Sequence, residues 1–166
     1  SLVDGFTTNP SLMRLAGAKN YKDYSLKILK ICKKKSISFE VFADNLKDML
    51  KQAYEINSWG KNVYVKIPVV NSKGKFTGSV IKELSDKGIK LNITAVYTFE
   101  QTQKIYKKLS KKTKSIISIF AGRMADKGKD PLPIFKKSIS LTKKNKNIEI
   151  LWASTRAVSY THLRAH

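Results

Sequence analysis

The chain has 166 residues and an ordinary apolar content of 42%, which predicts one globular domain at most and argues against disorder. No apolar run approaches the ~20 residues that span a bilayer, and the lone cysteine, Cys32, excludes a disulfide framework and a cysteine-based metal cluster. We therefore expect a cytoplasmic protein with no membrane partner and no bound metal.

The net charge of +21 raises the question of a nucleic-acid partner. Among the 33 basic residues, however, only Arg14, Arg123, Arg156 and Arg164 are arginines, the residue type on which phosphate and base recognition most depends. The lysines are spread over all predicted helices rather than gathered into one patch with aromatic residues. Solvated helix faces are the favoured interpretation. A basic nucleic-acid-binding protein is kept as the non-enzyme alternative.

The N-terminal segment predicts a short strand that leads into a helix. Asn9 is a good N-cap, Pro10 suits the first helical position, and Gly17 suits the end of the helix. A second helix is predicted from residues at helical spacing, and its core-facing stripe comprises Tyr21, Tyr24, Ile28, Ile31 and Cys32.

The rest of the chain alternates between strand-like and helical patterns. The strand-like runs cover roughly residues 36–43, 62–70, 89–97, 115–121 and 148–154. Between them, Thr98 and Gln101 form a capping box at the start of one helix, and Asp130 with Pro131 opens the last one. Strands begin 26 or 27 residues apart at positions 36, 62, 89 and 115, which is the length of a βα unit. Such repeats predict a parallel sheet, either a doubly wound open sheet or a barrel.

Polar residues inside the strands favour the barrel. They lie two positions apart, and so on one face of each strand: Ser38 and Glu40, Asn92 and Thr94, Ser118 with Phe120, and Lys66 between Tyr64 and Pro68. An open sheet would bury such rows under apolar helices, whereas a barrel has an interior where they converge. We therefore predict an α/β fold, a (β/α)8 TIM barrel. About six of its eight strands are visible, so we expect a barrel truncated at both ends.

Lys66 interrupts the apolar run 62–70, and its position alone allows two interpretations. It is either a solvated charge at a strand end or a buried amine kept for chemistry. A buried lysine is held more easily as the neutral nucleophile, which can attack a ketone and form a Schiff base. Glu40 is then the candidate acid/base, and Thr94 the candidate to hold the catalytic water. Equally, Glu40 can be a strand-end carboxylate paired with a neighbouring lysine.

The strand exits carry candidate phosphate ligands. Arg123 follows one strand, and Ser154 and Arg156 follow the last one. Both arginines can instead be ordinary loop residues, and Asn9 can be only a helix cap.

Taken together, the chain resembles the transaldolase family of Schiff-base class I aldolases, specifically its small bacterial and archaeal members. The resemblance covers residues 1–156, which we interpret as a partial TIM-barrel catalytic domain. It is carried by Gly5-Phe-Thr-Thr-Asn-Pro-Ser11, Val63-Tyr-Val-Lys-Ile-Pro68, Leu91-Asn-Ile-Thr-Ala95, Phe120-Ala-Gly-Arg123 and Trp152-Ala-Ser-Thr-Arg156. Residues 157–166 leave the family pattern, and we interpret them as a foreign or readthrough tail.

The resemblance implies transfer of a dihydroxyacetone unit between sugar phosphates in the pentose phosphate pathway, without a cofactor. Lys66 would form the Schiff base, and Glu40 with Thr94 would handle the water. The residues that would contact the sugar are Asn9, Ser38, Asn92, Ser118 and Phe120, and those that would hold its phosphate are Arg123, Ser154 and Arg156. The sister branch of the family, fructose-6-phosphate aldolase, resembles a pattern with Gln in place of Glu40 and Tyr in place of Phe120. Both of these residues, and Asn92, resemble the transaldolase side and favour transaldolase. A homo-oligomer is a family expectation.

Overall fold

Six parallel strands form one sheet in the computed structural model of the chain, which describes residues 3–155. The order of the strands in the sheet follows their order in the sequence, and each pairs with the next in parallel. The strands are β1 (Gly5–Thr7), β2 (Ser36–Glu40), β3 (Val63–Pro68), β4 (Leu91–Val96), β5 (Ser115–Phe120) and β6 (Ile148–Ala153). All of the strand-like runs predicted from the sequence are therefore strands.

Seven helices connect and cover these strands in the described part of the chain. They are α1 (Pro10–Leu15), α2 (Tyr21–Ile31), α3 (Leu46–Ser58), α4 (Gly78–Asp86), α5 (Phe99–Lys108), α6 (Ala121–Ala125) and α7 (Leu132–Thr142). The predicted caps are present: the Asn9 side chain accepts a hydrogen bond from the Leu12 amide at 2.8 Å, and Thr98 with Gln101 forms a capping box. These local bonds fix where α1 and α5 begin.

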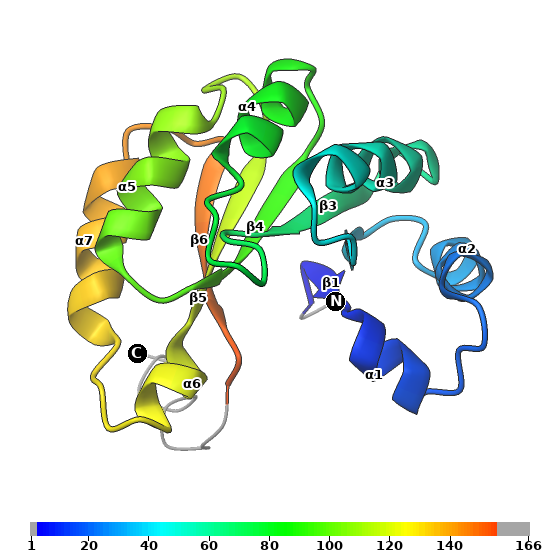
Figure 1. Cartoon of the computed structure of the whole chain (residues 1–166), viewed down its shortest axis with the longest axis horizontal. Coiled ribbons are helices and arrows are strands. Elements are labelled where there is room, and N and C mark those ends of the chain that lie inside the picture. Colours follow the sequence, from blue (N-terminus) through cyan, green and yellow to red (C-terminus); the bar gives the residue numbers. More distant parts are fainter. Residues whose placement is uncertain (1–2, 156–166) are drawn as a thin grey trace.

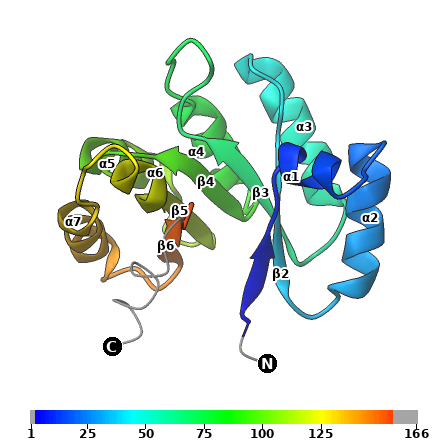
Figure 2. The ribbon, with the colours of Figure 1, turned by 90° about the horizontal axis from the view of Figure 1, so that it is seen from below.

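The sheet is curled into an arc, with helices α2, α3, α4, α5 and α7 around its outside (Figures 1 and 2). Val63, Val65 and Ile67 are completely buried and belong to the hydrophobic core, whereas Lys66 has the opposite orientation along the same strand. This arc of βα units confirms the predicted barrel class of fold. Its edges are β1 and β6 among the described residues, and the tail 157–166 lies outside them.

One predicted core residue was assigned wrongly. Tyr21, Tyr24 and Ile28 pack against the core as expected, but Ile31 is 84% exposed. Ile31 is the last residue of α2, where the chain turns towards β2, so its side chain no longer lies over the sheet. The following residue, Cys32, is a half-buried free thiol at the helix end.

Strand β4 contains a bulge that changes which side chains face the core. Ala95 has a left-handed backbone with φ of 59°, and the pairing with β5 shifts register between Ile93 and Val96. In a regular strand Thr94 and Val96 would share a face. Here Val96 is buried in the hydrophobic core, while Thr94 faces the cavity described below.

Candidate active site

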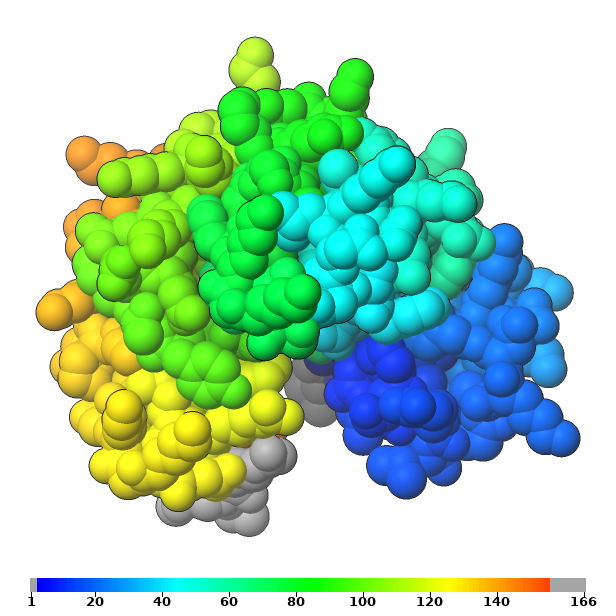
Figure 3. Space-filling model, in the orientation of Figure 1, coloured from blue at the N-terminus to red at the C-terminus, as the bar shows by residue number. Residues whose placement is uncertain are grey.

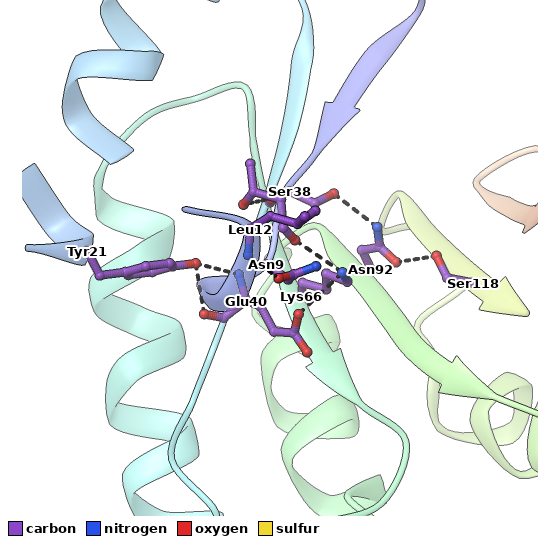
Figure 4. A network of polar contacts seen from close by, with 9 residues as sticks. Asn9, Leu12, Tyr21, Ser38, Glu40, Lys66, Asn92 and Ser118 are labelled. Atoms are coloured by element: carbon purple, nitrogen blue, oxygen red, sulfur yellow. Dashed lines mark hydrogen bonds and ion pairs between the residues drawn. The ribbon is translucent and has the colours of Figure 1, made fainter. Parts of the chain in front are cut away.

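Lys66 is buried on the concave face of the sheet, close to a carboxylate. Its side chain is only 10% exposed, and its Nζ lies 3.3 Å from Glu40 Oε2 and donates a hydrogen bond to the Thr8 carbonyl at 3.1 Å (Figure 4). Glu40 pairs in register with Lys66 across β2 and β3, which places both side chains on one face. Of the two interpretations left open by the sequence, the solvated surface charge is therefore excluded.

Three further strand residues form a buried chain of hydrogen bonds beside this pair. The Ser118 hydroxyl donates to Asn92 Oδ1 at 2.7 Å, and Asn92 Nδ2 donates to the Ser38 hydroxyl at 3.0 Å (Figure 4). All three residues are at most 3% exposed. The polar positions picked out from strands β2, β4 and β5 therefore meet in one layer, as predicted.

A cavity of about 410 Å³ opens in front of Lys66. Among the predicted site residues, those that line it are Asn9, Lys66, Thr94, Ser118, Phe120, Arg123 and Ser154. Ser38, Asn92 and Glu40 do not line the cavity; Glu40 approaches it through its contact with Lys66. Figure 3 shows that the surface is hollowed between the N-terminal segment carrying α1 and the segment carrying α6.

Thr94 differs from the other buried polar residues of the site. It is 1% exposed, yet its hydroxyl has no hydrogen-bond partner among residues 3–155. A buried hydroxyl without a partner costs free energy, and a polar cavity large enough for water or a ligand can supply the missing partner. The cavity in front of Thr94 therefore suits a polar occupant.

The outer part of the cavity carries positive charge. Arg123 is exposed on α6, and its guanidinium carbon lies 5.2 Å from the centre of the Phe120 ring, which packs edge-on against Tyr97. Ser154 follows β6 in a left-handed conformation with φ of 60°. The other predicted phosphate ligand, Arg156, lies outside the described residues. An anionic group at this end of the cavity would meet at least the Arg123 guanidinium.

Asn9 caps α1, as the sequence predicts, and also lines the cavity. The cap uses only the oxygen of its amide. The Nδ2 group takes no part in that bond, so the helix cap and contact with a ligand are compatible.

Two residues of the site were missed by the sequence analysis. Thr8 contributes its backbone carbonyl to Lys66, and Tyr21 contributes a phenol that donates to the Glu40 carbonyl at 3.0 Å and accepts from the Glu40 amide at 2.9 Å. Burial raises the pKa of Tyr21 to about 12, against the opposing effect of its hydrogen bond to the Glu40 backbone. For Thr8 the signal was its place beside Asn9 in the stretch Thr7-Thr8-Asn9. For Tyr21 there was none beyond its inward helical position.

Within residues 3–155, no group of three or more His, Cys, Asp or Glu side chains is placed to hold a metal ion. The helices in this range are also too short or too polar to cross a membrane.

The fold and the site define the class of protein. It is a βα barrel in which a buried lysine faces a cavity at the carboxyl ends of the strands and pairs with a carboxylate behind it, and barrel enzymes carry their active sites at this end. Comparison with known proteins agrees. The family model for transaldolase/fructose-6-phosphate aldolase matches residues 1–166. The chain belongs to this family.

Relatives with curated names include a "Probable transaldolase" from Herpetosiphon aurantiacus, 32% identical over 93% of this chain and 66% of the relative. Similar proteins with the same name occur in Dehalococcoides mccartyi, 32% identical over 86% of this chain and 62% of the relative, and in Methanococcus maripaludis, 36% identical over 78% and 55%. The chain thus spans less than two thirds of the length of each of these relatives.

Proposed function

We propose that the protein catalyses the transaldolase reaction through a Schiff base on Lys66. A dihydroxyacetone unit would pass from a ketose phosphate, sedoheptulose 7-phosphate or fructose 6-phosphate, to an aldose phosphate, as a cytoplasmic step of the pentose phosphate pathway. The observation that carries this proposal is a buried lysine that faces a polar cavity with a carboxylate 3.3 Å away. The name shared by its relatives, "Probable transaldolase", supports it.

The first half of the reaction attaches the donor sugar. Glu40 is close enough to take a proton from Lys66, and the neutral amine then attacks the ketone carbon to give a carbinolamine. Loss of water from the carbinolamine gives the protonated imine. The unpartnered Thr94 hydroxyl is suited to hold that water while Glu40 supplies the proton that the leaving oxygen needs.

The second half breaks one carbon–carbon bond and makes another. As the carbon–carbon bond breaks, the hydroxyl next to it gives its proton to Glu40 through the held water and becomes the aldehyde of the released aldose phosphate. The positive imine accepts the electron pair of the bond, which leaves an enamine on Lys66. The enamine carbon attacks the aldehyde of the acceptor, and addition of water to the new imine frees the product and the lysine. Glu40 returns the protons through the same water, since acid and base roles alternate.

Substrate binding would use both parts of the cavity. Asn9, Ser118 and Phe120 line it and would contact the sugar, with Ser38 and Asn92 holding Ser118 from behind. Arg123 and Ser154 would meet the phosphate, and Arg156 is proposed for the same role from its sequence position alone.

The test is borohydride trapping with a ketose phosphate donor. Reduction should leave a stable adduct on Lys66, and Lys66→Ala should abolish it. Lys90→Ala is the matched control, because Lys90 is also partly buried but donates to the Lys61 carbonyl at the opposite end of the strands. An unmodified wild-type chain, or an adduct that survives in Lys66→Ala, would refute the proposal.

Product analysis separates the two activities that the family name covers. Transfer should require an aldehyde acceptor. Release of free dihydroxyacetone without an acceptor, at a rate that matches transfer, would instead assign fructose-6-phosphate aldolase activity.

A further inference from the structure

We propose that Tyr21 is a positioning residue that fixes the backbone of Glu40 and so sets the contact between the Glu40 carboxylate and the Lys66 amine. This inference rests on the proposed function, in which Glu40 serves Lys66. It assigns a task to a helix residue that lies outside the strands of the sheet.

The end of strand β2 explains why such a residue is needed. The Ser38 carbonyl accepts a hydrogen bond from the Thr8 amide, so this edge of β2 faces β1. Strand β1 ends at Thr7, paired with Ser38, and two residues later Glu40 lies beyond its reach. The backbone amide and carbonyl of Glu40 therefore have no strand partner on that side, and buried backbone groups need one.

The Tyr21 phenol takes the place of the missing strand. It donates to the Glu40 carbonyl at 3.0 Å and accepts from the Glu40 amide at 2.9 Å, so one hydroxyl satisfies both groups of the same residue (Figure 4). Glu40 is the last residue of β2 and the following segment is a loop. Without the phenol, no other hydrogen bond from residues 3–155 would hold the Glu40 backbone on the β1 side.

The phenol is itself held firmly. Its ring packs against Phe42 and Trp59, with ring centres 5.6 Å and 6.0 Å away. Tyr21 therefore holds the backbone of the residue whose carboxylate lies 3.3 Å from the Lys66 amine, and it leaves the amine itself untouched.

Tyr21→Phe removes the hydroxyl and keeps the ring. The matched control is Tyr24→Phe on the same helix, one turn away, where the lost hydroxyl donates to the Ala16 carbonyl at 3.4 Å. If Tyr21 acts only by packing, both variants should show the same modest effect. If Tyr21 positions Glu40, only Tyr21→Phe should show an effect.

The first measurement needs no turnover. In the wild-type chain and both variants, amide hydrogen exchange at Glu40 is followed by NMR, and reductive methylation of Lys66 by peptide mass. Tyr21→Phe should speed exchange at the Glu40 amide by about tenfold or more. It should also slow the methylation of Lys66, because the carboxylate that takes the proton of the amine is displaced. Unchanged exchange and labelling would overturn the proposal.

The second measurement uses the transfer reaction, expressed per site that can be trapped with borohydride. Tyr21→Phe should lower kcat about tenfold with KM changed less than about twofold, because the donor still binds but the proton-transfer group is misplaced. In a Glu40→Gln background the same change should have little further effect. Equal losses in both backgrounds would overturn the proposal, since Tyr21 would then act independently of the Glu40 carboxylate.

The two proposals fail differently. A wild-type chain that forms no borohydride adduct removes the proposed function, whereas the exchange and methylation results decide the role of Tyr21 on their own.

Discussion

Replacing Thr94 with valine should stabilise the protein and impair its chemistry at once. The Thr94 hydroxyl is buried and has no hydrogen-bond partner among the described residues, although the residue is only 1% exposed. In protein mutational data an unpartnered buried hydroxyl costs about 1–3 kcal/mol. Valine keeps the shape of threonine and suits a strand. Water in the cavity of about 410 Å³ would offset part of this cost, so we expect a gain near the lower limit, about 1 kcal/mol.

The matched control is a threonine whose hydroxyl is used by the fold. Thr77 is completely buried, and its hydroxyl donates to the Pro68 carbonyl at 2.7 Å. Thr77→Val should therefore destabilise the protein by about 1–2 kcal/mol. The assay is urea denaturation followed by circular dichroism, with the free energy of unfolding compared at equal slopes.

The same preparations test the chemistry. Loss of the proposed water-holding group should lower the rate of adduct formation on the order of 100-fold in Thr94→Val, and leave it unchanged in Thr77→Val. A Thr94→Val protein as destabilised as Thr77→Val would refute the reasoning from burial. A stabilised Thr94→Val protein with wild-type rates would refute the catalytic role.

Three further predictions follow from the geometry. Asn92→Ala removes both buried hydrogen bonds of its side chain, so urea denaturation should show a loss of about 2–4 kcal/mol, and adding Ser118→Ala should then cost much less than it does alone. Ala95→Gly relieves about 1 kcal/mol of left-handed strain but raises the conformational entropy of the unfolded chain, so the free energy of unfolding should change little. Ala95→Val places a branched side chain at φ of 59° and should lower the free energy of unfolding by about 1–3 kcal/mol. The pKa of Tyr21 is raised from 10.0 to about 12 by burial, so the folded protein keeps a proton that the unfolded chain loses: this contribution to stability is complete below pH 10 and is lost as the pH rises to 12. Urea denaturation should show that stability falls less between pH 9 and pH 11 in Tyr21→Phe than in the wild-type chain. Equal losses in the two proteins would contradict the raised pKa of Tyr21.

The periodicity of apolar residues predicted the elements well and their ends less well. The apolar pattern predicts one strand over 36–43, but β2 ends at Glu40. Val41 is 4% exposed and packs into the core, and its amide still donates to the Lys66 carbonyl of β3 at 3.1 Å although it lies beyond the end of β2. Burial alone therefore extends an apolar pattern beyond the last paired residue. The end of a strand depends on where its neighbours stop, and this is a property of the whole sheet.

The strand residues of the site could be predicted because two simple rules place them. Side chains alternate along a strand, and parallel pairing in register brings equal depths together, which is how Lys66 meets Glu40. Neither rule reaches Thr8, which acts through a backbone carbonyl that any residue type possesses. Nor does either reach Tyr21, because an inward tyrosine on a helix is most often a core residue and its partner is again backbone.

The buried polar groups of the site fall into two kinds, and the difference bears on how the site works. Ser38, Asn92 and Ser118 satisfy one another without a ligand, so we expect their substitution to cost stability first. The Thr94 hydroxyl has no partner within the described part of the chain, so we expect its substitution to cost chemistry first. Lys66 lies between these two kinds. Its contacts with Glu40 and the Thr8 carbonyl hold the amine, and in the proposed reaction the amine gives up the first of them when it attacks the ketone. Because the Lys66 amine gives up its contact with Glu40 when it reacts, that contact cannot keep the Glu40 carboxylate in place. Another group has to hold Glu40, and this is the physical reason for the rigid Tyr21 phenol behind it.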